Sequence, residues 1–366
     1  MFENREHLRT NIQRELKSKN LVVNKHPNAD LYIYNYSREC QYKMNWNKTT
    51  LNCRGLILDG EYNIIARPFG KFFNYEEHQT ERLKEKVPSI PDLPFKVFEK
   101  LDGSCGILYW VKDKLAIATR GSFASDQSLH ATNILYKKHK DKFKFLDKKW
   151  TYIFEILYKQ NRVVIDYGDK DDIVLLAVID NKTGEEYDIT NPQINPGFET
   201  VKEYTEFRGK TFRQLQKMNI NNEEGFVLVY ENGFRVKIKF PEYIRLHSLL
   251  TNVTKKKIWE NLMNGDSLEE LIENIPDESF EWIKEEINRL KTGYKETEQV
   301  ALNTYNKLEK ELFGIPFKLH RKKFAQAVFK EKETSNIASI LFAMLDGKKY
   351  DNIIWKFLKP VENKNE

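Results

Sequence analysis

The pattern of hydrophobic and polar positions changes near residue 250. Before this point, short apolar runs of strand length alternate with turn residues, which is typical of antiparallel sheets. After it, apolar residues recur three or four positions apart, which predicts helices. We therefore expect an α+β fold, with a domain of antiparallel sheets and flanking helices over residues 1–250 and an all-α domain over residues 251–366.

Turn residues divide the first part into pairs of strand-like runs. The clearest turn is Asn232-Gly233, because an Asn-Gly pair favours the tight turn of a hairpin. A helix is predicted from Ser125 to about residue 140, with Leu129, Ile134 and Leu135 on its buried face. The other runs predict hairpins of residues 56–58 with 63–66, 106–111 with 115–119 and 225–230 with 234–240, and strands over 95–98, 150–157 and 173–179.

Apolar residues at helical spacing fill the second part. One stripe begins at Phe280 and continues to Leu312, and Gly314 and Pro316 then interrupt it. Asp266-Ser267 has the residue types that cap the start of a helix, and this short helix would end before residue 276. Three more helices are expected over residues 317–330, 335–345 and 350–358.

Composition agrees with two folded domains, because 366 residues are many for one core and 40% of them are hydrophobic. Cys40, Cys53 and Cys105 are too few and too scattered for a disulfide framework or a zinc site. The N-terminal residues lack the apolar segment of a signal peptide, and no apolar run is long enough to span a membrane. A protein of the cytosol is expected. The net charge of +6 permits an anionic partner without requiring one.

The candidate chemistry begins at Lys100-Leu101-Asp102-Gly103-Ser104, between two predicted strands. A lysine in such a segment is usually a solvated charge, so these residues alone predict only a surface turn. Further short motifs follow one another in order on both sides and change this interpretation. They are Tyr34-Asn35-Tyr36, Cys53-Arg54-Gly55, residues 69–74 (FGKFFN), 119–122 (TRGS), Phe154-Glu155, 224–227 (EGFV) and 236–239 (VKIK), then Tyr243 and Leu246-His247-Ser248.

This ordered set resembles the covalent nucleotidyltransferases, the superfamily of polynucleotide ligases and mRNA capping enzymes. In detail it is most similar to the bacteriophage RNA ligase 1 family, and the resemblance covers most of residues 30–250. Two positions depart from the family pattern. Arg120 stands where a lysine is expected, which keeps the charge but changes its hydrogen-bonding geometry, and Leu101 replaces an acidic residue.

The resemblance implies an ATP-dependent RNA ligase with Mg²⁺ as its metal. Lys100 would attack the α-phosphate of ATP and carry AMP, AMP would move to the 5′-phosphate of an RNA end, and a 3′-hydroxyl would then seal the strand. The implied catalytic residues are Lys100, Glu155, Lys237, Lys239, Tyr243 and Ser248. The implied nucleotide-binding residues are Tyr34, Arg54, Lys71, Phe73, Gly103, Arg120, Glu155, Glu224, Gly225, Lys237 and Lys239.

The resemblance also assigns individual roles and partners. Arg54 would contact ribose and phosphate, Tyr34 and Lys71 would hold the β- and γ-phosphates, and Glu224 would ligate the metal or a water. RNA with 5′-phosphate and 3′-hydroxyl ends is the implied partner, with a cleaved tRNA as one substrate read by the helical domain. We also expect the protein to be a monomer that works in the cytoplasm of a bacterial host.

The chemistry itself calls for cations beside the nucleophile. A lysine amine is protonated at neutral pH and has to lose its proton before it attacks. Strand residues alternate between faces, so Arg235, Lys237 and Lys239 share one face of their predicted strand. They would favour the neutral form of Lys100 and bind the α-phosphate as its charge develops. The same pattern also fits an amphipathic surface hairpin with solvated lysines.

The two motif glycines can also be interpreted either functionally or structurally. Gly103 and Gly225 could let the nucleotide approach the backbone closely, or they could be ordinary turn glycines. Asp277 is a candidate metal ligand, although acidic residues at the start of a helix are common partners of the helix dipole. The basic runs 255–257 and 321–323 could contact RNA phosphates or could be solvated helix faces.

Two other functions stay open. The chain could be a non-catalytic RNA-binding protein with the same fold, although simple binding would not need the lysines and glutamates of the motifs together. It could also be a capping-type guanylyltransferase, which would use GTP. Capping enzymes and DNA ligases usually follow the Lys-x-Lys strand with an OB-fold barrel, whereas this chain predicts helices there.

Overall fold

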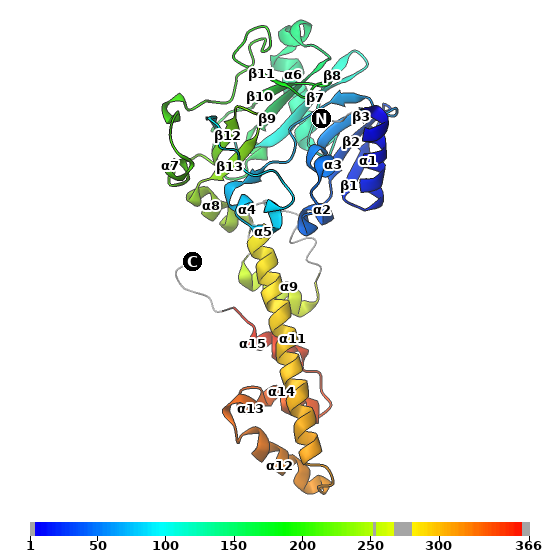
Figure 1. The fold of residues 1–366 in the computed structure, drawn as a ribbon, viewed down its shortest axis with the longest axis vertical. Helices are drawn as coiled ribbons and strands as arrows, with labels where there is room; N and C mark the ends of the chain where they lie inside the picture. The colour runs from blue at the N-terminus through cyan, green and yellow to red at the C-terminus, as the bar shows by residue number, and fades with distance from the viewer. Residues whose placement is uncertain (1–3, 252–253, 267–279, 361–366) are drawn as a thin grey trace. The chain divides into compact units, whose positions relative to one another are not determined.

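A computed structural model describes residues 4–251, 254–266 and 280–360. The chain forms two compact units, Met1–His247 and Ser248–Glu366. The first unit contains three sheets with flanking helices and the second is helical, which confirms the predicted α+β class (Figure 1). Among the described residues, no helix is both long and apolar enough to cross a membrane.

The first sheet is an antiparallel meander with the order β1-β2-β3-β4. The helix α1 packs Leu8 and Ile12 into a core with Tyr34, Tyr36 and Leu56 of this sheet. Only the first residue of β1 is buried, so this strand lacks the alternation that would have predicted it. The elements are α1 (Arg5–Lys17), β1 (Leu21–Lys25), β2 (Leu31–Tyr36), α2 (Arg38–Lys43), α3 (Lys48–Asn52), β3 (Arg54–Asp59) and β4 (Ile64–Ala66).

The second sheet has five strands in the order β11-β10-β9-β7-β8. The helix α6 buries Ala131, Ile134 and Leu135 against this sheet. The prediction that Leu129 is buried was wrong, since its side chain is 58% exposed. It lies five positions before Ile134, about 140° away around the helix. The elements are β7 (Ser104–Val111), β8 (Lys114–Ala118), α6 (Asp126–Lys138), η1 (Lys140–Phe145), β9 (Trp150–Leu157), η2 (Lys159–Asn161), β10 (Asp172–Asp180) and β11 (Glu186–Tyr187).

The third sheet has the order β5-β13-β12-β6, with β5 parallel to β13 and the other pairs antiparallel. The predicted hairpin around Asn232-Gly233 is its centre, with β12 paired to β13. Its elements are β5 (Phe73–Asn74), α4 (Tyr75–His78), α5 (Glu81–Lys84), β6 (Phe95–Glu99), η3 (Thr205–Phe207), α7 (Phe212–Gln216), β12 (Gly225–Tyr230), β13 (Arg235–Lys239) and α8 (Pro241–Thr251).

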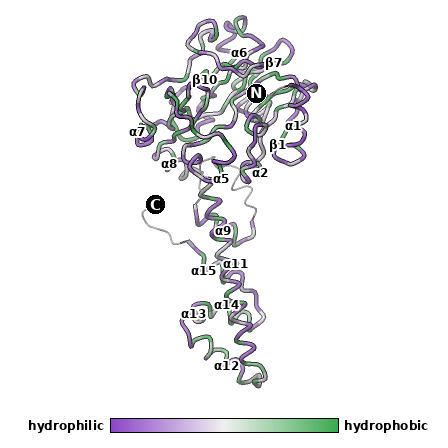
Figure 2. The backbone as a smooth tube through the Cα atoms, viewed as in Figure 1, coloured by the Kyte–Doolittle hydropathy of each residue, from purple (hydrophilic) through white to green (hydrophobic). Residues whose placement is uncertain are grey.

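Apolar side chains join the first two sheets. Ile33 and Ile57 of the first sheet share a core with Ile107 and Tyr109 of the second. Hydrophobic stretches accordingly follow β7 and β10 through the interior of this unit (Figure 2). The two sheets therefore form one scaffold, and β7 runs from the Lys100 motif at its start to a hairpin at its end.

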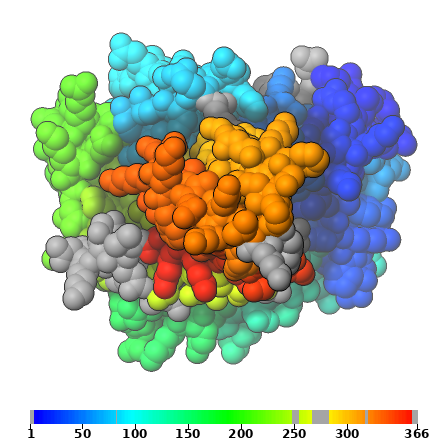
Figure 3. Space-filling view, turned by 90° about the horizontal axis from the view of Figure 1, so that it is seen from below, coloured from blue at the N-terminus to red at the C-terminus, as the bar shows by residue number. Residues whose placement is uncertain are grey.

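The second unit is built on one long helix, α11, whose residues Ile283, Ile287 and Leu290 pack with Ile258 of α9. Later helices pack against it, with Leu308 and Ala301 of α11 in shared cores. Figure 3 shows the orange and red surfaces of these later segments. The predicted helix 335–345 is interrupted at Ile337, and the predicted helix after Asp266-Ser267 lies outside the described residues. The helices are α9 (Lys255–Asn264), α11 (Phe280–Glu311), α12 (Phe317–Val328), α13 (Lys332–Asn336), α14 (Ala338–Leu345) and α15 (Asp351–Phe357).

Candidate active site

Lys100 lies directly after β6, where the third sheet meets the start of β7. Its backbone N–H donates to the carbonyl of Gly225 at 2.9 Å, so the backbone of the motif is fixed to β12. Its side chain is 19% exposed, and Nζ lies 2.6 Å from Oε2 of Glu224. The Lys100 amine is therefore partly exposed to solvent, and the carboxylate of Glu224 balances its charge.

Glu224 is a carboxylate shared by two amines. Its side chain is 2% exposed, and its second oxygen Oε1 lies 2.6 Å from Nζ of Lys239. Burial alone would raise the pKa of Glu224, but Lys100 and Lys239 hold it below its ordinary value. The sequence predicted cations beside Lys100, and the structure places one there with a buried carboxylate between the two amines.

Glu155 lies on β9, and its Oε1 accepts a hydrogen bond from the backbone N–H of Gly103 at 3.0 Å. Burial raises the pKa of Glu155 to about 7, and the neighbouring Glu224 adds to the increase. The positive charge of Lys100 opposes it without cancelling it. Near neutral pH, Glu155 can therefore either hold or release a proton beside the motif.

Asp102 is a residue of the Lys100 motif for which the sequence predicted no role. It is 5% exposed, and its Oδ2 accepts from the backbone N–H groups of Val164 at 2.8 Å and Ile165 at 2.9 Å. Its Oδ1 accepts from the hydroxyl of Tyr243 at 2.8 Å, and its own N–H donates to the hydroxyl of Tyr167 at 2.7 Å. Asp102 thus holds the motif loop in place. Its position inside the Lys-x-Asp-Gly segment is the sequence feature from which this role could have been predicted.

Both motif glycines are required by the protein's own packing. A Cβ at Gly103 would lie 2.5 Å from the carbonyl oxygen of Ile156. Gly225 has a φ of +151°, and a Cβ there would lie 2.0 Å from the carbonyl oxygen of Ile238. These glycines therefore allow backbone segments of the protein to approach one another closely, and this requirement does not depend on a bound nucleotide.

Arg54 and Arg120 both lie near Cys105, which is paired with Glu155 across β7 and β9. Burial raises the pKa of the Cys105 thiol, while Arg54, which is hydrogen-bonded to the sulfur, and Arg120 oppose this increase. Arg120 also donates from Nη1 to the hydroxyl of Tyr36 at 3.2 Å. Two of the predicted phosphate-binding cations are thus brought to the same strand end as Glu155.

Lys71 is buried among aromatic rings. Its Nζ lies 5.5 Å, 5.8 Å and 5.2 Å from the ring centres of Tyr36, Trp46 and Phe73. Tyr36 joins this group to Arg120, whereas Phe73 is a core residue with 3% exposure. Tyr34 is also in this core, where its hydroxyl is hydrogen-bonded to that of Tyr62. The described contacts do not bring Tyr34 to the Lys100 group, and its role stays a prediction.

The three cations of β13 have different partners. The Nζ of Lys237 lies 5.1 Å from the ring centre of Phe72, and Lys239 belongs to the Glu224 pair. Arg235 instead forms an ion pair with Glu186 of β11, away from the nucleophile.

Two predicted residues cannot be placed. Ser248 lies on α8 but its side chain is outside the described structure, and Asp277 lies outside the described residues altogether. Within the described part of the chain, no group of three or more His, Cys, Asp and Glu side chains could hold a metal.

A sequence model of the RNA ligase family matches residues 52–243, which is more than half of the chain. The chain belongs to this family. The matched segment contains Lys100, Glu155 and Glu224, and it omits Tyr34, Ser248 and Asp277. The predicted family is therefore confirmed, together with the class of enzyme that it contains.

Two relatives that are similar in sequence agree with this assignment. An RNA ligase of Rhodothermus phage RM378 is 26% identical over 355 residues, which cover 78% of this chain and 77% of the relative. A protein of Thermovibrio ammonificans described as an RNA ligase is 30% identical over 222 residues, 55% of each chain. The solved structure of Naegleria gruberi RNA ligase with PPi is 19% identical, with a TM-score of 0.34 over 43% of this chain and 52% of that one.

Proposed function

We propose that this member of the RNA ligase family is an ATP-dependent ligase that carries AMP on Lys100. The observation that supports this most directly is the buried Glu224, which holds the amines of Lys100 and Lys239 at 2.6 Å each. A surface lysine would not need such a partner. When ATP binds, its negatively charged α-phosphate could take the place of Glu224 as the partner of these two amines.

The first step would form a bond between Nζ of Lys100 and the α-phosphorus while the bond to pyrophosphate breaks. Lys100 has to lose a proton before it attacks, and Glu155 can accept one because burial raises its pKa to about 7. Lys239 and Lys237 would balance the charge that develops on the α-phosphate. Arg54, which is hydrogen-bonded to the thiol of Cys105, would contact the ribose and the α-phosphate.

The β- and γ-phosphates would bind Lys71, with Arg120 beside it through Tyr36. The hydroxyl of Tyr34 would have to leave Tyr62 to join them. Mg²⁺ fits such a site because it is commonly held by one or two carboxylates together with phosphate oxygens. Glu224 is the carboxylate that would hold it, and the metal would neutralise the leaving pyrophosphate.

The later steps would use RNA. AMP would move from Lys100 to the 5′-phosphate of one RNA end, and the 3′-hydroxyl of another end would attack that phosphate and release AMP. The helical unit would select the RNA, and a cleaved tRNA is one substrate that the family resemblance suggests. We propose a monomer at work in the cytoplasm of a bacterial host.

Labelling with radioactive ATP tests the proposal. The purified chain is incubated with Mg²⁺ and α-labelled ATP, and the label is followed on a denaturing gel. We expect labelling of the unmodified chain and of Lys96→Ala, an exposed lysine on the preceding strand β6, but not of Lys100→Ala. The bond should break in acid and survive base, as a phosphoramidate does.

The alternative functions predict other results. Labelling by GTP instead of ATP would indicate a capping-type guanylyltransferase. Equal labelling of Lys100→Ala would remove Lys100 as the nucleophile. If neither nucleotide labels chain that has been freed of bound AMP with pyrophosphate, the catalytic proposal fails and a non-catalytic RNA-binding protein takes its place.

A further inference from the structure

The segment 312–330 of the helical unit, which contains α12, is strongly basic. It holds five Lys and Arg residues and no Asp or Glu, although the whole chain is nearly balanced at 60 Lys and Arg against 54 Asp and Glu. The segment includes the basic run 321–323, for which the sequence left an RNA contact and a solvated helix face equally open. The side chains that the structure exposes here decide between these two interpretations.

The two sides of α12 differ. Phe324 and Val328 are fully buried, in a core with Leu308 of α11 and Leu341 of α14. This core fixes the helix in the unit, so its other side is a surface of defined shape. Exposed residues recur there three or four positions apart, which places them on one side of the helix. They are Leu319, Lys322, Lys323 and Gln326.

Carboxylates of neighbouring elements meet α12 beside its buried side. Asp346 forms an ion pair with Arg321, and Oε1 of Glu309 lies 3.4 Å from Nε2 of His320. Both partners on α12 flank the buried stripe of the helix. Three exposed lysines form no ion pair among the residues that the structure describes, and they are Lys322, Lys323 and Lys330. Their positive charge is therefore available to an anionic partner.

Two phenylalanines of the same segment are exposed to solvent. Phe313 follows α11 and is 92% exposed, and Phe329 follows α12 and is 60% exposed. Lysines interleaved with exposed aromatic rings are the pattern by which proteins hold single-stranded nucleic acids, because the bases stack on the rings and the phosphates meet the lysines. A protein partner fits less well, since lysine is depleted in protein–protein interfaces.

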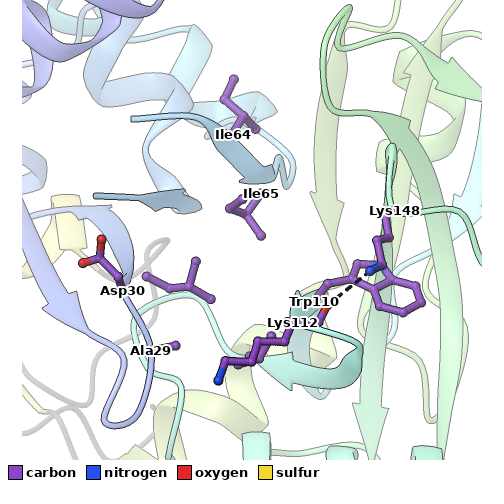
Figure 4. Close-up of a pocket in the computed structure, with 9 residues that line it drawn as sticks. Ala29, Asp30, Ile64, Ile65, Trp110, Lys112 and Lys148 are labelled. Atoms are coloured by element: carbon purple, nitrogen blue, oxygen red, sulfur yellow. Dashed lines mark hydrogen bonds between the residues drawn. The ribbon is translucent and has the colours of Figure 1, made fainter. Parts of the chain in front are cut away.

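The cavity between the first and second sheets has a different lining (Figure 4). Its volume is about 400 Å³, and Leu31, Ile64 and Ile65 supply its walls from the first sheet. The indole of Trp110 lies against Lys148 and is turned away from Ile64 and Ile65. These walls are aliphatic and give an RNA base no ring to stack on, whereas the segment 312–330 combines exposed rings with cations.

We propose that the exposed side of α12, together with Phe313 and Phe329, binds an unpaired stretch of the RNA substrate. Unpaired bases stack on the two rings, and the phosphates between them contact the three exposed lysines. The proposal rests on the proposed function, because it takes RNA as the substrate. It goes further by assigning the RNA contact of the helical unit to one surface and to RNA that is not base-paired.

The test uses one variant that removes a ring and one that reverses charge. They are Phe313→Ala and Lys322→Glu/Lys323→Glu, and all three side chains are exposed, so the fold should be unaffected. The matched controls, at exposed positions of α15 and α11, are Phe357→Ala and Lys291→Glu/Lys295→Glu. Anisotropy measures binding of a fluorescein-labelled RNA stem with an unpaired loop, and of the same stem as a blunt duplex, over a range of salt concentrations.

We expect Phe313→Ala to bind the loop RNA at least about fivefold more weakly than the unmodified chain, as the loss of one stacked base implies. Its salt dependence and its affinity for the duplex should not change. Lys322→Glu/Lys323→Glu should reduce the slope of log affinity against log salt concentration by about 1.4, because each phosphate contact of a single strand contributes about 0.7. Both controls should bind as the unmodified chain does.

The outcomes separate this proposal from the proposed function. Unchanged affinity in both variants, or an equal loss in Phe357→Ala, would overturn the α12 surface. An equal loss for loop and duplex in Phe313→Ala would also overturn it, because stacking requires unpaired bases. Displacement of the RNA by polyglutamate of equal charge would show a general acidic-ligand surface instead. Lysyl-AMP formation should proceed equally in all variants, and its absence from the unmodified chain would count against the ligase proposal alone.

Discussion

Replacing Glu155 with glutamine tests the charge balance of the candidate site. Burial raises the pKa of Glu155 from 4.5 to about 7, so the folded protein binds a proton at this carboxylate more tightly than the unfolded chain does. The penalty for ionising it is absent below pH 4.5, grows as the pH rises from 4.5 to about 7, and is constant above that. A neutral glutamine carries no such penalty, and its oxygen can still accept the hydrogen bond from Gly103.

The size of the effect follows from the shift. One pKa unit corresponds to about 1.4 kcal/mol, so the ionised carboxylate destabilises the fold by at most about 3.5 kcal/mol above pH 7. At about pH 5.5 the penalty is only about 1.4 kcal/mol, because this pH lies one unit above the ordinary pKa. The advantage of Glu155→Gln should therefore grow by up to about 2 kcal/mol between about pH 5.5 and pH 8.5. Glu155 keeps some exposure to water, which reduces the value further.

Thermal unfolding of the full chain at these two pH values measures the difference, with Glu231→Gln at an exposed position as the control. We expect the midpoint of Glu155→Gln to exceed that of the unmodified chain by several degrees more at the higher pH. Lysyl-AMP formation should fall sharply in the same variant because the proton acceptor is gone. A stability difference that does not change with pH, or that shrinks as the pH rises, would refute the reasoning.

Three further substitutions test the framework around Lys100. Tyr243→Phe removes the buried hydrogen bond to Asp102 and should cost about 1–3 kcal/mol in urea unfolding, with slower lysyl-AMP formation. Gly103→Ala drives a methyl group to 2.5 Å from the carbonyl oxygen of Ile156, so adenylylation should be lost, which a gel assay measures. Glu224→Gln removes the buried negative charge that the partly buried amines of Lys100 and Lys239 share, and should destabilise the fold by about 3–5 kcal/mol, whereas an unchanged unfolding curve would contradict the shared ion pair.

The parts of the fold that the sequence predicted are those set by local patterns. The hairpin at Asn232-Gly233 depends on its turn residues, and the long helix α11 depends on an apolar stripe within one segment. The strand β1 was missed because four of its five residues are exposed, so its formation depends on pairing with β2. Leu129 was misplaced because hydrophobicity alone does not fix which face of a helix is buried.

The candidate site also contains residues that the sequence predicted and residues that it did not. Order along the chain was enough to predict Lys100 and Glu224, and the structure brings them to 2.6 Å from each other. Lys239 lies opposite Gly225 in the hairpin that the sequence predicted, so its place beside Glu224 follows from that local pattern. The anchoring of Asp102 by Tyr243 instead depends on a contact between distant segments, which no local pattern encodes. The sequence also gave no signal for Tyr167, whose hydroxyl accepts the N–H of Asp102.

The anchoring of Asp102 has a consequence for the order in which the protein forms. Its partners lie 62, 63 and 141 residues further along the chain, at Val164, Ile165 and Tyr243. During synthesis the N-terminal segments emerge first, and contacts between distant residues are slow to close. The loop that carries Lys100 can therefore reach its final support only after most of the first unit has left the ribosome. A nascent chain stopped before Tyr243 would hold its nucleophile without the last of these supports.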